Sequence, residues 1–131
     1  MKVVLDASAA VQIALNRIPL ADHRKAVADA DEVLAPDLIV AEVTNTIWKY
    51  HQFEKLELET CHQMLELALG LPDTLIPAKE LYREAFLLAR TSRLAAYDMF
   101  YLALAQREDA TLLTIDQGLR KEAKRHGVRV V

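Results

Sequence analysis

The chain has 131 residues, of which 53% are hydrophobic and 27% are charged, and its formal net charge at pH 7 is −3. These values exclude a disordered chain and a strongly basic nucleic-acid-binding protein, and the length predicts a single domain over residues 1–131. Asp6 comes too early for a signal peptide, and no apolar run reaches the roughly 18 residues of a membrane span. The single cysteine, Cys61, excludes an internal disulfide and favours a reducing cytoplasmic location.

Strands and helices are predicted to alternate along the chain. The first half contains, in chain order, a strand at 3–5, helices at 7–17 and 20–30, a strand at 32–35, and helices at 37–51 and 56–70. The second half contains a strand at 74–76, helices at 78–91 and 95–107, a strand at 112–115, a helix at 117–126 and a strand at 128–131. Pro19 separates the first two helices, and Pro36 suits the first turn of the third. Gly70 and Gly127 are expected to cap the helices that end beside them.

This order of elements predicts an α/β fold in which helices cover both faces of a parallel sheet. The predicted strands are apolar without a polar alternation, as expected for strands that are buried on both faces. In such sheets, ligand sites lie outside the carboxyl ends of the strands. Polar residues at those ends are therefore the first candidates for a functional site.

Two acids occupy such positions. Asp6 directly follows the strand at 3–5, and Asp116 directly follows the strand at 112–115. If these strands are neighbours in the sheet, both carboxylates lie in the same crevice. The alternative interpretation is that each acid only caps the helix that follows it, because aspartate is a preferred N-cap residue.

Two further acids lie among apolar residues of predicted helices. Glu42 has apolar neighbours in PDLIVAEVTNTIW, and Asn45 shares its side of the helix. Asp98 has apolar residues and a tyrosine at helical spacing, and no Lys or Arg lies three or four positions away. A carboxylate in such a setting is usually paired or bound to a metal. The alternatives are a half-exposed position for Glu42 and a favourable interaction with the helix dipole for Asp98.

Four carboxylates in one crevice would repel one another. Each pair about 4 Å apart costs roughly 1 kcal/mol in water and about 4 kcal/mol at an effective dielectric constant of about 20. A divalent cation removes this repulsion, and all-oxygen ligation favours Mg²⁺ or Mn²⁺ over zinc. The histidines show no metal-ligand spacing, and Cys61 and His62 are interpreted as an ordinary pair on a helix. Acid-bound Mg²⁺ is the arrangement used for phosphoryl transfer and phosphodiester hydrolysis.

Four stretches carry a family resemblance: VLDASAAV at 4–11, APDLIVAEVTNTIW at 35–48, LAAYDMFYLALA at 94–105 and LLTIDQGLRKEA at 112–123. Together they resemble the PIN domain family, and closely the VapC toxins of bacterial and archaeal toxin–antitoxin pairs. The resemblance implies a three-layer α/β/α fold around a five-stranded parallel sheet of order 3-2-1-4-5. It also implies a Mg²⁺- or Mn²⁺-dependent endoribonuclease, a homodimer, and a cognate VapB-like antitoxin that covers the site.

The resemblance assigns catalysis and metal binding to four acids, which are Asp6, Glu42, Asp98 and Asp116. Asp6 and Asp98 are expected to bind metal directly. Glu42 is expected to bind metal or to act through a water, as the base that orients the nucleophile. Asp116 is expected to act through water or to bind a second metal. Polar residues that would orient these acids also match the family pattern, namely Ser8, Asn45 and Thr114.

Substrate contacts are expected from basic residues, because phosphate contacts supply much of the affinity for nucleic acids. The candidates lie near the third and fourth acids: Arg90, Arg93, Arg120, Lys121, Lys124 and Arg125. The alternative is that these residues only form solvated helix faces. The leucine-rich helix at 56–70 is interpreted either as core or as a docking face. Two other functions remain open, a PIN-type nuclease of RNA processing and a non-catalytic nucleic-acid-binding or regulatory module.

Overall fold

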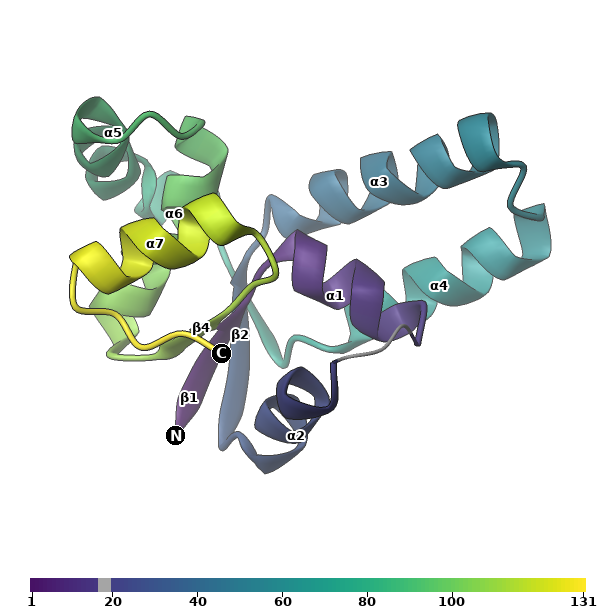
Figure 1. Cartoon of the computed structure of the whole chain (residues 1–131), viewed down its shortest axis with the longest axis horizontal. Coiled ribbons are helices and arrows are strands. Elements are labelled where there is room, and N and C mark those ends of the chain that lie inside the picture. The colour runs from purple at the N-terminus through teal and green to yellow at the C-terminus, as the bar shows by residue number, and fades with distance from the viewer. Residues whose placement is uncertain (17–19) are drawn as a thin grey trace.

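The computed structural model describes residues 1–16 and 20–131, in which strands and helices alternate (Figure 1). The strands are β1 (Lys2–Leu5), β2 (Glu32–Pro36), β3 (Thr74–Ile76) and β4 (Thr111–Leu113). The helices are α1 (Ala7–Ala14), α2 (Ala21–Asp29), α3 (Ile39–Glu54), α4 (Leu58–Gly70), α5 (Tyr82–Thr91), α6 (Ala96–Glu108) and α7 (Gln117–Arg125), with a 3₁₀ turn η1 (Ala78–Glu80) before α5. Helix α1 ends at Ala14, before the predicted end at Arg17, because Leu15 caps it and Asn16 has a positive φ of 57°. Arg17 itself and the predicted break at Pro19 lie outside the described residues.

Within the described residues, the strands form one four-stranded parallel sheet of order β3-β2-β1-β4. Val4 of the central strand β1 pairs with Leu34 of β2 on one side and with Leu112 of β4 on the other. The first and fourth strands are therefore neighbours, as the predicted order requires. Because they are parallel, their carboxyl ends open at the same edge of the sheet.

The fifth predicted strand, at 128–131, is reduced to a single parallel bridge between Val130 and Leu112. The Leu112 amide donates to the Arg129 carbonyl at 2.8 Å, and the Val131 amide donates to the Leu112 carbonyl at 3.0 Å. The segment thus occupies the fifth position beside β4 without forming a strand. Gly127, at φ 73°, turns the chain from α7 toward this position, as expected for a glycine that ends a helix.

The prediction that Pro36 opens a helix is wrong, because Pro36 is the last residue of β2 and pairs with Ile76 of β3. A turn follows in which the Asp37 amide donates to the Ile76 carbonyl at 2.8 Å. The Asp37 carboxylate accepts from the Ala78 amide at 2.9 Å. This turn uses the residues that a longer helix would have needed, so α3 begins at Ile39.

Other details of the predicted elements also differ from the structure. Gly70 is the last residue of α4 and not its cap, since Leu71 caps the helix in a right-handed helical conformation. The predicted helix at 78–91 is divided into η1 and α5. The predicted strand at 112–115 is replaced by β4, so Thr114 lies beyond the strand and within the turn to α7. The last difference matters because Thr114 belongs to the site described below.

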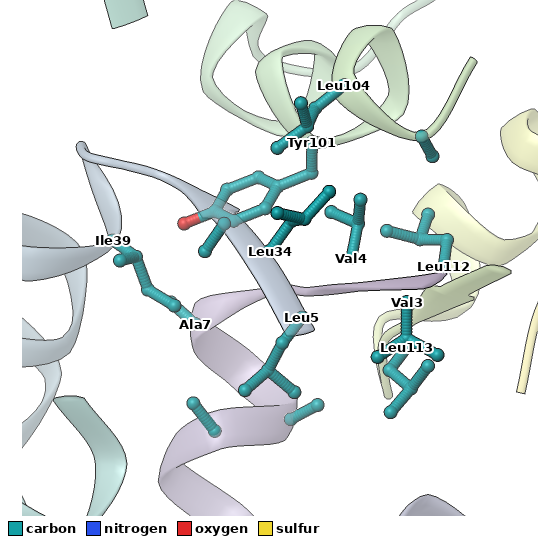
Figure 2. Packing of buried hydrophobic residues seen from close by; sticks show 14 of the residues in the cluster. Val3, Val4, Leu5, Ala7, Leu34, Ile39, Tyr101, Leu104, Leu112 and Leu113 are labelled. Atoms are coloured by element: carbon teal, nitrogen blue, oxygen red, sulfur yellow. The ribbon is translucent and has the colours of Figure 1, made fainter. Parts of the chain in front are cut away.

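Side chains of alternate strand residues pack on opposite faces of the sheet (Figure 2). Val4 and Leu34 point to the side where Tyr101 and Leu104 of α6 lie, and Leu5 points to the opposite side. All five side chains are almost fully buried in one hydrophobic cluster. Helix α6 packs against β1, β2 and β4, and α5 packs on α6. Both faces of β1 are thus covered by protein, as predicted for a parallel sheet.

Helix α4 combines both interpretations of the leucine-rich segment. Cys61, Met64 and Ala68 are buried and belong to the core. Leu58 and Leu67 are more than half exposed on another side of the same helix. Among the described residues, no helix is long and apolar enough to cross a membrane.

Candidate functional site

The junction between β1 and α1 holds Asp6 in a buried position. Its Oδ1 atom accepts from the Ala9 amide at 2.9 Å, which caps α1, and from the Ser8 hydroxyl at 2.8 Å. Its Oδ2 atom accepts from the Thr114 hydroxyl. Burial raises the pKa of Asp6 to about 6, although these three hydrogen bonds oppose the shift; the charge of Asp98 raises the pKa further. Asp6 therefore caps a helix and also carries an unfavourable buried charge.

The junction between β4 and α7 holds Asp116 in an exposed position. Its Oδ1 atom accepts from the Leu119 amide at 2.7 Å and caps α7. The Asp116 amide donates to the Thr114 hydroxyl oxygen at 3.0 Å. Because the same hydroxyl donates its proton to Asp6, Thr114 connects the two junctions. Capping and site formation are thus compatible for both acids.

Glu42 projects from the first turn of α3 and meets α6. Its Oε1 atom accepts from the hydroxyl of Tyr101 at 2.7 Å. Burial raises the pKa of Glu42, and this hydrogen bond opposes the shift. Burial first, and then the charge of Glu42, raise the pKa of Tyr101 well above its usual range, so the hydroxyl stays protonated and acts as the donor.

Asp98 lies in the first turn of α6 and is half-buried. Burial first, and then the charges of Asp116 and Glu42, raise its pKa to about 6. The largest electrostatic effects on Asp98 after burial thus come from other acids of the site. This is the condition under which a cation stabilises a group of carboxylates most.

All four predicted acids line one pocket of about 350 Å³, together with Ser8 and Asn45. The pocket thus includes every predicted acid and every predicted orienting residue except Thr114, which is connected to it through its hydrogen bonds to Asp6 and Asp116. The acids come from two strand ends and two helices, so the fold brings together residues that are far apart in the sequence. Their chemical roles remain predictions.

The pocket also includes residues that the sequence did not single out. Tyr101 follows Asp98 by three positions, so helical spacing alone was a usable signal. Lys49 is the one cation that lines this pocket within the described part of the chain. It follows Glu42 by seven positions, which places both on one side of α3. Gln12 of α1 lies at the rim shared with a neighbouring pocket.

The basic residues that were predicted to contact RNA lie elsewhere. Within the described residues, none of the six lines the acidic pocket. Arg120 lines the neighbouring pocket, and Arg125 forms an ion pair with Glu122 at 2.6 Å. Arg90 and Arg93 are exposed near the start of α6. Of these candidates, Arg120 is therefore placed best for a substrate that enters the acidic pocket.

The donor set of the pocket suits Mg²⁺ or Mn²⁺, because it consists of carboxylate oxygens without a histidine or cysteine. Burial first, and neighbouring acids second, raise the pKa values of Asp6 and Asp98, and a bound cation would stabilise the charged form of both carboxylates. Among the described residues, no three His, Cys, Asp or Glu side chains are grouped closely enough to form a metal centre. The acids would have to move closer together around an ion, and Asp98 has the most freedom to do so since it is only half-buried and caps no helix.

Comparison with known proteins gives one consistent result. The family model of the PIN domain matches residues 3–125. Ribonuclease VapC3 of Pyrobaculum aerophilum is 32% identical over 124 residues, which cover 93% of this chain and 95% of that relative.

Two solved structures share the fold at lower sequence identity. The crystal structure of PAE2754 from Pyrobaculum aerophilum matches with a TM-score of 0.71 and 22% identity, over 100% of this chain and 84% of that chain. FitAcB from Neisseria gonorrhoeae matches with a TM-score of 0.61 and 21% identity, over 98% of this chain and 95% of that chain. Taken with the match of the family model over nearly the whole sequence, these similarities place the chain in the PIN domain family.

Proposed function

We propose that this protein is a Mg²⁺- or Mn²⁺-dependent endoribonuclease and the toxin of a VapBC-type toxin–antitoxin pair. The observation that carries the proposal is the pocket in which Asp6, Glu42, Asp98 and Asp116 meet. The similarity to Ribonuclease VapC3 supports RNA as the substrate. The match of the PIN family model to residues 3–125 supports a single nuclease domain over residues 1–131.

Asp6 and Asp98 are the acids that would hold the ion, with Asp116 close enough to Asp98 to raise its pKa. A bound Mg²⁺ or Mn²⁺ supplies charge neutralisation at the phosphate and lowers the pKa of a coordinated water. Ser8 and Thr114 keep the Asp6 carboxylate in one orientation through their hydroxyl groups. This fixed orientation lets Asp6 act without a conformational search.

Glu42 is the proposed general base. The Tyr101 hydroxyl occupies its Oε1 atom, which leaves Oε2 to take a proton from the attacking water. The raised pKa of Glu42 brings it closer to neutral pH, where a general base is most effective. Lys49 at the same pocket supplies a positive charge for a phosphate oxygen of the RNA.

Two partners belong to this proposal. A VapB-like antitoxin would cover the acidic pocket, and a second copy of the chain would form a homodimer. Apolar side chains that are exposed on helices supply surfaces for such contacts, including Leu58 and Leu67 on α4 and Phe86 on α5.

The test is cleavage of a mixed pool of structured RNAs by the purified protein, with Mg²⁺, with Mn²⁺ and with EDTA. Asp98→Asn protein, prepared identically, controls for contaminating ribonucleases. We expect cleavage that requires metal and is lost in the variant. Equal cleavage by both proteins would argue against the assignment of the acids. In that case a co-expressed candidate antitoxin would have no ribonuclease activity of this protein to suppress.

A further inference from the structure

A second and larger pocket adjoins the acidic one. It has a volume of about 960 Å³, and it shares Gln12 and Ile115 with the acidic pocket. Its walls come from α2, the turn after β4, the start of α7 and the last residues of the chain. In the view of Figure 1 the C-terminus lies between α7 and α2, and residues of all three line this pocket. We name it the side pocket.

Thr114 connects the two pockets chemically. Its hydroxyl holds Asp6 at the floor of the acidic pocket. Its carbonyl oxygen lies 3.4 Å from the His23 Nε2 atom and accepts from the Arg120 guanidinium at 3.3 Å, and both of these side chains line the side pocket. A ligand that contacts His23 or Arg120 therefore touches a side chain that itself contacts Thr114, the residue whose hydroxyl orients Asp6.

The side pocket differs from the acidic pocket in its lining. Its apolar wall includes Leu20, Ala26, Ile115, Val130 and Val131. Its polar lining includes Gln12, His23, Thr114, Gln117 and Arg120, together with the charged residues Asp22, Lys25 and Asp29. Apolar walls with a few convergent polar groups are typical of a site for a ring-shaped organic ligand.

Among the described charged residues of the side pocket, Arg120 is the one that favours the binding of an anion. Lys25 is paired with Asp29 at 2.6 Å, so these two charges offset each other. Asp22 is exposed at the rim. The Arg120 guanidinium donates a hydrogen bond to the Thr114 carbonyl and forms no ion pair with a carboxylate within the described residues. Its positive charge is therefore available to bind an anion next to the acidic pocket. The His23 Nδ1 atom is buried and has no hydrogen-bond partner among the described residues.

We propose that the side pocket binds a nucleoside of the RNA next to the scissile phosphate. Arg120 contacts the phosphate that joins this nucleoside to the neighbouring nucleotide. This inference rests on the proposed nuclease function, because it places the scissile phosphate in the acidic pocket. The nucleobase packs on the apolar wall, and His23 and Gln117 face its polar edge. The volume lies within the range of about 300–1,000 Å³ for small-ligand sites, which accommodates a nucleoside. Sequence-specific recognition of RNA usually targets unstacked, single-stranded bases, which are the kind of group that such a pocket could take.

The first experiment detects the pocket without any cleavage. The full chain in EDTA is titrated with each ribonucleoside 5′-monophosphate, and the imidazole C–H signals of the histidines are followed by NMR. The signal of His23 is assigned from its loss in His23→Asn. We expect a saturable shift of His23, while His51 and His62, which line neither pocket, stay unchanged.

A matched pair of variants tests the role of the guanidinium. Arg120→Gln should weaken the binding of the mononucleotide by about fivefold, because it removes a charge-assisted contact with the phosphate. Arg107→Gln is the control, since Arg107 is exposed, pairs with Glu80 and lines neither pocket. No saturable shift of His23, or equal weakening by both variants, overturns the proposal.

The second experiment distinguishes a nucleotide within RNA from a free nucleotide. A short RNA that the enzyme cleaves is prepared with an abasic residue at each position around the cleavage site. We expect one abasic position beside the scissile bond to lower kcat/KM in the wild type, with little further loss in Arg120→Gln. If mononucleotides bind but no abasic position matters, the pocket serves a free nucleotide and the proposal is wrong. If RNA is not cleaved at all, the nuclease function fails, whereas the NMR titration still decides whether the pocket binds nucleotides.

Discussion

The β1–α1 and β4–α7 junctions have the same local structure but differ in how deeply their aspartates are buried. Each consists of a short apolar strand, an aspartate and a helix that the aspartate caps through its Oδ1 atom. Asp6 is nevertheless only 5% exposed, whereas Asp116 is exposed. The cause is the place of each strand in the sheet, since β1 lies between β2 and β4 and β4 has a single bridge on its outer side. Equal sequence patterns therefore produce unequal electrostatic environments.

The largest expected effect compares the two acids directly. Asp6→Asn should lower metal-dependent RNA cleavage by about 10²–10³-fold, because it removes a charge that is buried and held in one orientation. Asp116→Asn should lower cleavage by only about tenfold, because the exposed side chain contributes through solvent or a more distant ion. Single-turnover cleavage rates at saturating Mn²⁺ measure both. Equal losses in the two variants would mean that depth in the sheet does not determine the role of these acids.

The second prediction breaks the connection between the junctions. Thr114→Val removes the donor to Asp6 and the acceptor for the Asp116 amide at a fully buried position. The free energy of unfolding should fall by about 2 kcal/mol, since two buried polar groups lose a partner. Urea unfolding of the metal-free protein measures the change.

Thr111→Val is the matched control for that variant, at the other end of β4. Thr111 is also buried, but its contacts are longer, 3.5 Å to the Met1 sulfur and 3.4 Å from the Arg129 guanidinium. Its replacement should cost less than about 0.5 kcal/mol. Similar losses in the two variants would show that the hydroxyl of Thr114 has no special role.

The third prediction concerns Glu42, which lies outside both junctions and accepts a hydrogen bond from Tyr101. Tyr101→Phe removes the hydrogen bond to Glu42 and keeps the ring that packs in the core. Cleavage should fall by about fivefold through kcat, with KM unchanged, because the general base loses its orientation and the RNA contacts stay intact. An increase in KM at constant kcat would instead assign Tyr101 to RNA binding.

The smallest predicted effect concerns Asp98 and the dependence of protein stability on pH. Because its pKa is raised to about 6, the metal-free protein loses stability as the pH rises through 6 and regains it as the pH falls toward 4. Asp98→Asn should therefore melt higher than the wild type at pH 7.5 without metal. After allowance for its half-exposed position, the gain is about 1 kcal/mol, or about 4 °C.

Two measurements check the sign of this effect. At pH 4 the difference in Tm between the variant and the wild type should nearly vanish, since the wild-type carboxyl is then protonated in the folded protein and to a large extent also in the unfolded chain. Mn²⁺ should raise the Tm of the wild type more than that of the variant. A variant that melts lower than the wild type at both pH values, with an unchanged response to Mn²⁺, would contradict the proposed role of Asp98.

Local patterns were sufficient to predict the acids at the strand ends. The strand preceding Asp6 and the helix following it depend on neighbours within a few positions, and the same holds for Asp116. The parallel sheet followed from the alternation of elements. The family resemblance supplied the order that makes β1 and β4 neighbours, which periodicity alone does not determine.

Long-range contacts were not predictable in the same way. The hydrogen bond between Tyr101 and Glu42 joins residues of α6 and α3 that no local pattern relates. The segment at 128–131 has the composition of a strand, but one bridge to Leu112 is all the pairing that it forms. The predicted RNA contacts of the six basic residues stay predictions, and their sequence positions did not indicate that only Arg120 lines the pocket beside the acids.

The short strand at one side of the sheet has a consequence for the behaviour of the protein at high concentration. β3 has three residues, and Pro77, which lacks an amide proton, follows it directly. On the other side, the segment around Val130 covers β4. Neither border of the described sheet offers another chain a long row of unpaired backbone groups, so strand-to-strand aggregation is disfavoured. Copies of this protein that associate are therefore expected to do so through helical surfaces.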